Sequence, residues 1–165
     1  MLAASAREAL WFLPLAAPVA LWAAWSDMKF MKIPNKAVLA LAGIFAVTGV
    51  FALPLPDYGW RWVHLAVVLA ITFAMTMVGM IGAGDAKFAA AMAPYIALGD
   101  LRLFIGIFSA SLLAAFVVHR GLRAIPAVRA ATPDWASWTS RKFPMGLALG
   151  GALVIYLGLI AVRGA

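Results

Sequence analysis

Long runs of apolar residues, separated by short polar breaks, extend through the whole sequence. An α-helix needs about 20 mostly apolar residues to cross a hydrocarbon layer about 30 Å thick, and several runs approach this length. The pattern predicts membrane spans at residues 9–26, 37–53, 62–81, 87–98, 101–118 and 144–162. We therefore expect an all-α, polytopic membrane helix bundle with about six transmembrane helices, formed by a single domain over residues 1–165.

The fourth predicted span, residues 87–98, differs from the others because a helix of this length rises only about 18 Å. It is either a short tilted crossing or a re-entrant segment. A crossing places nine lysines and arginines on one side of the membrane and four on the other. The positive-inside rule then assigns the side with nine basic residues to the cytoplasm, and with it the long loop at residues 119–143, which is cytoplasmic or interfacial.

Composition supports a membrane protein and argues against a nucleic-acid partner. Hydrophobic residues make up 66% of the chain, charged residues 12%, and the mean hydropathy is +1.01. The net charge of +7 arises from basic residues between apolar runs, so membrane topology explains it and the lipid bilayer is the expected partner. The chain has no cysteine, which excludes thiolate metal sites and cysteine nucleophiles, and we expect neither a metal nor a cofactor.

Two acidic residues, Asp27 and Asp85, stand at the predicted cytoplasmic ends of the first and third spans. An acidic side chain at membrane depth is costly and usually faces a cavity or a partner. Two carboxyl groups on one side of the membrane can share a proton and activate a water molecule, chemistry that requires no metal. For either aspartate alone, solvation at a helix end is the alternative. Asp57 and Asp100 fall on the other side, where we expect local ion pairs with Arg61 and Arg102.

Several residues beside the two aspartates are expected to shape the site. Gly82 and Gly84 can break the helix before Asp85 and let the backbone approach another chain. Pro34 and Asn35 are expected to start the second span, with Asn35 satisfying free amides at its first turn. For Lys87 three interpretations stay open: a charge that lowers the pKa of Asp85, a group that holds a substrate carbonyl, or an anchor at the membrane edge.

The segment Gly82-Ala83-Gly84-Asp85 resembles the GxGD signature shared by presenilins, signal peptide peptidases and prepilin peptidases. Asp27, followed by Lys29, Lys32 and Ile33-Pro34-Asn35, is similar to the prepilin peptidase pattern of an aspartate before Ile-Pro-Asn. Together the two motifs identify the chain as resembling the type IV prepilin peptidase family over most of its length. The segment from Lys142 to Gly146, followed by Gly150, loosely resembles the entry of that family's last span.

The resemblance implies a membrane aspartyl endopeptidase with Asp27 and Asp85 as catalytic residues. Its substrate would be a prepilin, cut between a short basic leader and a hydrophobic helix at the cytoplasmic face of a bacterial or archaeal inner membrane. The products serve pilus or type II secretion-like assembly. Bifunctional relatives carry a cysteine-bearing methyltransferase domain, so this short, cysteine-free sequence instead resembles the small peptidases of tight-adherence (Tad/Flp) pili or archaeal preflagellin-type enzymes, without methyltransferase activity.

Two other interpretations of the aspartate pair remain open. A non-catalytic membrane assembly or ion/proton-transport protein would use Asp27 and Asp85 as a binding or relay site. The sequence shows no inverted repeat and no further carboxylate within a predicted span, which disfavours transport. A degenerate peptidase acting as a scaffold is the second alternative, although both aspartates and the glycines before Asp85 are present.

Overall fold

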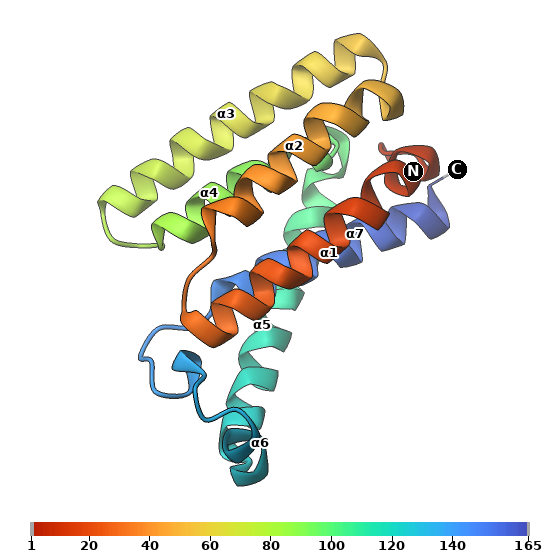
Figure 1. Ribbon diagram of the computed structural model, residues 1–165. Helices are drawn as coiled ribbons and strands as arrows, with labels where there is room; N and C mark the ends of the chain where they lie inside the picture. Colours follow the sequence, from red (N-terminus) through yellow and green to blue (C-terminus); the bar gives the residue numbers. More distant parts are fainter. Residues whose placement is uncertain (1, 165) are drawn as a thin grey trace.

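The computed structural model describes residues 2–164, which fold into helices joined by short connections, without a β-strand in this range (Figure 1). The prediction of an all-α fold is confirmed. The α-helices are α1 Ala6–Phe30, α2 Asn35–Ala52, α3 Leu55–Met77, α4 Ala83–Met92, α5 Leu101–Ala124, α6 Pro126–Ala131 and α7 Met145–Arg163. Three short 3-10 helices are η1 Ala93–Tyr95, η2 Leu98–Asp100 and η3 Ala136–Trp138.

Five of these helices are long and apolar enough to cross a membrane: α1, α2, α3, α5 together with η2, and α7. The chain is therefore a multi-pass membrane protein. The expectation of about six full helical spans needs a correction, because the fourth predicted span is only the ten-residue helix α4 followed by η1 and η2. Pro94 accounts for the early end of α4, since it lacks the N–H that a continuing α-helix would use.

Although it is not one long helix, the segment from α4 to η2 connects the two ends of the bundle. Its first turn holds Asp85 near the end of α1, where Asp27 lies. At its other end, Asp100 accepts hydrogen bonds from the amides of Ala3 and Ala4, just before α1 begins. The segment thus follows the whole length of α1, as a crossing does, rather than returning to the side from which it started.

Two other boundaries differ from the predicted ones. Helix α3 starts at Leu55 rather than at residue 62, because Pro54 and Pro56 favour a helix start there. It ends at Met77 rather than at residue 81, and the turn that follows contains Gly79 with a positive φ of 76°, a conformation that glycine adopts readily. The predicted loop at residues 119–143 is partly helical, since α5 continues to Ala124 and α6 follows.

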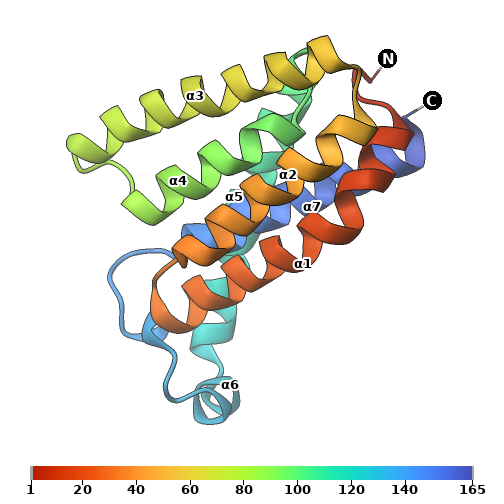
Figure 2. The ribbon, with the colours of Figure 1, turned by 45° about the horizontal axis from the view of Figure 1, so that its top comes forward.

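Helices α1 and α7 form the central pair and pack along much of their length, while α2 covers α1 and α3 lies against α4 (Figures 1 and 2). The buried face of α1 consists largely of alanines, among them Ala16, Ala20 and Ala23. These small side chains let α7 approach so closely that a Cβ atom on Gly150 would lie 2.5 Å from the carbonyl oxygen of Ala20. Close approach through small residues is a main source of stability between membrane helices.

Three aromatic rings tie α1, α2 and η1 together in the buried core. The ring of Phe12 lies 5.6 Å from that of Phe45 and 5.0 Å from that of Tyr95, measured between centroids. The Tyr95 hydroxyl donates a 2.7 Å hydrogen bond to the carbonyl of Leu41, so its polar end is satisfied within the core. This cluster fixes the short fourth crossing against the first two helices.

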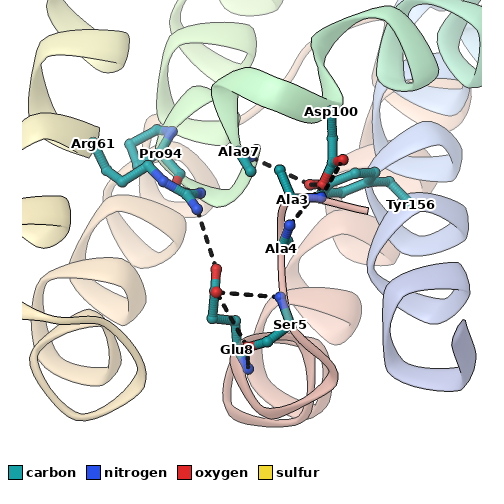
Figure 3. A network of polar contacts seen from close by, with 9 residues as sticks. All are labelled: Ala3, Ala4, Ser5, Glu8, Arg61, Pro94, Ala97, Asp100 and Tyr156. Atoms are coloured by element: carbon teal, nitrogen blue, oxygen red, sulfur yellow. Dashed lines mark hydrogen bonds and ion pairs between the residues drawn. The ribbon is translucent and has the colours of Figure 1, made fainter. Parts of the chain in front are cut away.

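A buried polar network holds the end of the bundle that contains both termini (Figure 3). Asp100 accepts from the amides of Ala3 and Ala4 at 2.7 and 2.9 Å and from the Tyr156 hydroxyl at 3.0 Å. The expected ion pair between Asp100 and Arg102 is therefore a wrong prediction. The carboxylate of Asp100 turns inward and accepts hydrogen bonds from these buried donors instead.

The second expected ion pair, between Asp57 and Arg61, is also wrong. Arg61 is buried, at 7% exposure, and its guanidinium donates to Glu8 at 3.1 Å and to the carbonyl of Pro94 at 3.0 Å. A buried guanidinium requires a paired carboxylate and further acceptors, and the exposed Asp57 provides neither. Glu8 in α1, Arg61 in α3 and Pro94 in η1 therefore join three separate elements.

Candidate active site

Asp27 lies in the last turns of α1 and is almost completely buried, with 5% of its surface exposed. Its carboxylate faces the first turn of α7, where the backbone amide of Gly146 donates a 2.7 Å hydrogen bond to Oδ2. Amides in the first turn of a helix have no partner within the helix and attract negative charge. The start of α7 therefore provides the environment that lets a carboxylate remain in this buried place.

The contact between Asp27 and Gly146 depends on the absence of a side chain at position 146. A Cβ atom there would lie 2.8 Å from the Cβ atom of Asp27 and 3.1 Å from its Oδ2. Because the Cβ atom of Asp27 is fixed by the α1 backbone, a larger residue would push the two helices apart or turn the carboxylate away. A glycine at position 146 is therefore required for the Asp27 carboxylate to occupy this place.

Asp85 is half-buried in the first turn of α4, three residues after the residue that caps this helix, Gly82. The backbone amide of Gly82 faces its carboxylate and lowers the pKa of Asp85. A Cβ atom on Gly82 would lie 2.7 Å from Oδ2 of Asp85. The motif Gly82-Ala83-Gly84-Asp85 therefore forms a helix start in which the carboxylate folds back over a glycine.

The two aspartates act on each other electrostatically, although 58 positions separate them in the sequence. Burial, followed by the negative charge of Asp27, raises the pKa of Asp85 to about 6. The Gly82 amide and the charge of Lys142 act in the opposite direction. A carboxyl group with a pKa of about 6 exchanges its proton close to neutral pH, as general acid–base chemistry requires.

Gly84 lets the start of α4 lie close to the turn between α1 and α2. A Cβ atom on Gly84 would meet Ile33 at 3.5 Å or more, which is an ordinary van der Waals distance. The turn is held to α1 by Ser26, whose hydroxyl donates a 2.9 Å hydrogen bond to the carbonyl of Lys32. Pro34 follows as the residue that caps α2, in extended conformation. The Ile-Pro-Asn segment and the glycine motif are therefore neighbours.

Asn35 and Lys87 contact each other, and Asn35 does not have the capping role expected from sequence. Asn35 makes no capping hydrogen bond at the start of α2; its side-chain oxygen instead accepts from Nζ of Lys87 at 3.4 Å. Lys87 is exposed and is turned toward this amide. The cation that favours the ionised form of Asp85 is Lys142, which lies just before α7. The sequence offered this electrostatic role for Lys87 only, as one of its open interpretations.

The connection between α6 and α7 lies beside the end of α1. Lys29 forms a 3.0 Å ion pair with Asp134, and the hydrogen bond from Lys29 lowers the pKa of that exposed carboxyl. On the other side, the ring of Trp138 stacks on His119 of α5 with a centroid distance of 5.3 Å. These contacts attach the connection to α1 and α5, and so hold Lys142 near the aspartates.

A large cavity of about 660 Å³ opens beside Asp85, between α3 and α5. Helices α4 and α7 contribute the residues between these two walls, including Ala89 and Met145. Asp85 is the only charged residue that lines the cavity, and most of the others are aliphatic or aromatic. One of the two carboxyl groups is therefore accessible from an apolar space within the span of the bundle.

The arrangement has two features that suit acid–base chemistry by carboxyl groups. One carboxyl group is buried and held by a backbone amide, and a second, with a pKa near neutrality, borders a cavity. Comparison with protein families matches residues 15–119 to the type IV leader peptidase family, well over half of the chain. The chain belongs to the type IV leader peptidase family. Comparison with curated proteins and with solved structures gives no significant match.

Members of the type IV leader peptidase family are aspartic prepilin peptidases, and membership implies prepilin leader cleavage. The match includes Asp27, the Ile33-Pro34-Asn35 segment and the glycine motif before Asp85. It ends before Lys142 and Gly146, the two contributions from the start of α7. The only sequence sign of these residues was the resemblance of their segment to the entry of the family's last span.

Proposed function

We propose that this type IV leader peptidase cuts prepilins with Asp27 and Asp85 as its catalytic pair. The observation that carries the proposal is their convergence: elements far apart in sequence bring both carboxyl groups to one end of the bundle, close enough for the charge of Asp27 to raise the pKa of Asp85. Gly82 and Gly146 leave room for the two carboxyl groups and place backbone amides beside them.

In the proposed reaction, one carboxyl group is ionised and the other is protonated. The ionised group accepts a proton from a water molecule as the water oxygen attacks the carbonyl carbon of the scissile peptide bond. The protonated group donates its proton to the carbonyl oxygen, which gives a neutral tetrahedral intermediate. In the collapse of the intermediate, the carboxyl group that took a proton from water donates it to the leaving nitrogen, and the other, now ionised, carboxylate accepts a proton from one hydroxyl of the intermediate. The carbon–nitrogen bond breaks, the leader leaves with a new carboxyl end, and the pair again holds a single proton.

The site faces the cytoplasm in this proposal. The helix ends and connections at the Asp27 and Asp85 end carry Lys29, Lys32, Lys36, Lys87 and Lys142, which matches the positive-inside rule. A prepilin inserted with its basic leader on the same side would present the junction between leader and helix at the depth of the two aspartates. The proposal includes a role in Tad/Flp-like pilus assembly and peptidase activity alone, because the methyltransferase of bifunctional relatives resides in a cysteine-bearing domain and this chain has no cysteine.

Co-expression with a prepilin tests the proposal, with processing followed by immunoblot. Asp27→Asn and Asp85→Asn should each abolish cleavage at normal protein levels in the membrane, because each removes one proton-transfer group while keeping the shape of the side chain. Asp57→Asn is the matched control, since this exposed carboxyl group lies at the opposite end of the bundle. Cleavage by both Asp27→Asn and Asp85→Asn would show that other residues carry the reaction.

A further inference from the structure

The apolar cavity beside Asp85 extends along the bundle as a groove between α3 and α5, two helices that lie apart in both overall views (Figures 1 and 2). Ile81, Asp85 and Met145 line one end of the groove. Trp60 and Leu98 line the other end, near the segment where Asp100 binds Ala3 and Ala4. The groove therefore has the length of the membrane-spanning part of the protein.

The lining of the groove suits an apolar helix. Ala89, Ala93 and Ala97 lie at intervals of four residues between the two walls, and such small residues allow the backbone of a second helix to come close. The walls offer larger aliphatic side chains, among them Val67 and Ile71 on α3. Membrane helices associate through this kind of shape complementarity, because lipid chains are as apolar as the side chains themselves.

The length of the groove and the charged residue at one end distinguish between two apolar occupants, a lipid acyl chain and a transmembrane helix. One lipid acyl chain reaches only half of the bilayer, so it does not match a groove that runs from one membrane edge to the other. A transmembrane helix does match. Asp85 at one end then requires that the reacting bond of the occupant lie at that end of its helix.

We propose that the groove between α3 and α5 binds the apolar helix of the substrate, with the N-terminal end of that helix at Asp85. This inference rests on the proposed function, since Asp85 must be catalytic for the position of the scissile bond to matter. Helix α3 runs toward the Asp85 end, from Leu55 to Met77. The bound helix starts at that end and runs away from it, so it lies antiparallel to α3.

An antiparallel arrangement predicts a specific register of contacts. Ile71 and Val67 are one turn apart on the groove side of α3, and Val67 is the farther from Asp85. If a given substrate position lies against Ile71, the position about four residues later in the substrate lies against Val67. A parallel helix would show the reverse order.

Cysteine cross-linking tests this proposal directly, because the natural chain has no cysteine. Single cysteines replace Val67 or Ile71 on the groove side of α3, and Leu69 or Phe73 on its opposite side. The two sides are matched in exposure: Val67 is 49% and Ile71 56% exposed, against 40% for Leu69 and 61% for Phe73. The Asp85→Asn substitution keeps the substrate intact. The probe is a co-expressed prepilin with a basic leader and one cysteine, moved along its apolar helix, and disulfides are formed by oxidation in isolated membranes.

We expect strong cross-links from the two groove positions, weak ones from Leu69 and Phe73, and a shift of about four substrate residues between Ile71 and Val67. Equal cross-linking on both sides of α3, or the reverse shift, would overturn the groove assignment. In the wild-type background, Ile71→Trp should reduce processing several-fold, whereas Phe73→Trp should not. Processing without groove-specific cross-links would refute the binding of the substrate helix in the groove and leave the peptidase proposal intact. Groove-specific cross-links without processing by the wild type would support helix binding in the groove and contradict the peptidase proposal.

Discussion

The backbone amide of Gly146 donates a 2.7 Å hydrogen bond to the carboxylate of Asp27, across 119 positions of sequence. This bond joins the first and the last helices of the bundle at the candidate active site. It also explains why position 146 is a glycine, since a Cβ atom would lie 2.8 Å from that of Asp27. The position of the buried carboxylate therefore depends on a close contact between α1 and α7.

Gly146→Ala should strongly reduce processing. The added methyl group must displace either α7 or the Asp27 side chain, and a displacement of about 1 Å at a catalytic group costs roughly 10²-fold in rate. The measurement is the rate of prepilin cleavage at equal protein levels. Gly151→Ala is the control, because no atom lies within 4 Å of the Cβ atom built there. Equal rates for the two variants would contradict a role of the Gly146 contact.

Gly82→Ala and Gly84→Ala should separate the two glycines of the GxGD motif. At Gly82 the new Cβ atom would meet Oδ2 of Asp85 at 2.7 Å, so the carboxylate must rotate away from the backbone amide. At Gly84 the nearest atom is 3.5 Å away. We expect Gly82→Ala to lose most of its activity while keeping its thermal stability, because only a short side chain must move, and Gly84→Ala to retain most of it. A greater loss in Gly84→Ala would refute this distinction.

Lys142→Met should shift the pH dependence of cleavage. The charge of Lys142 favours the ionised form of Asp85 and so lowers a pKa that burial and Asp27 raise to about 6. Removing the charge raises that pKa, so Asp85 becomes protonated at a higher pH. Asp27 is the ionised member of the pair, since its charge raises the pKa of Asp85, so loss of the Asp85 proton sets the alkaline side of the activity profile. If the pair must hold a single proton, this alkaline side moves to higher pH in the variant. Arg141→Met serves as the control, and an unchanged profile in Lys142→Met would show that this charge does not act on the reacting pair.

Sequence reasoning identified the all-α membrane fold, the family and the two aspartates, because each has a local signal. Apolar runs mark membrane helices, and charged residues next to such runs are conspicuous. The catalytic roles of Asp27 and Asp85 stay predictions until they are tested. The glycine motif was also recognisable, since a helix start is a local structure and this one involves only residues 82–85.

The remaining features depend on contacts between distant segments, which no local pattern specifies. Gly146 and Lys142 reach the aspartates only because α7 packs on α1. The expected pairs of Asp57 with Arg61 and of Asp100 with Arg102 were based on closeness in sequence. The folded chain instead places Arg61 beside Glu8, 53 positions away, since burial requires a partner that is also buried.

The network around Asp100 yields the last prediction, which concerns stability rather than catalysis. Asp100→Ala removes the acceptor of three hydrogen bonds, two of them from the amides of Ala3 and Ala4, and leaves buried donors without partners. Each unsatisfied buried donor costs about 1–3 kcal/mol, so the melting temperature of the purified protein should fall by several degrees. Asp57→Ala, an exposed acidic residue, should leave it unchanged.

The same variant distinguishes a structural from a functional role for this end of the bundle. Asp100 lies beside Ala3 and Ala4, at the end that contains the termini (Figure 3). Asp27 and Asp85 lie at the other end of the bundle. Below its melting temperature, Asp100→Ala should therefore process prepilin at the wild-type rate per folded molecule. A rate that falls while the protein remains folded would mean that the two ends are coupled. Two segments join them directly: the chain from α4 to η2, which links Asp85 to Asp100, and α7, which carries both Tyr156 and Gly146. Measuring the rate and the melting curve on the same preparation separates these two outcomes.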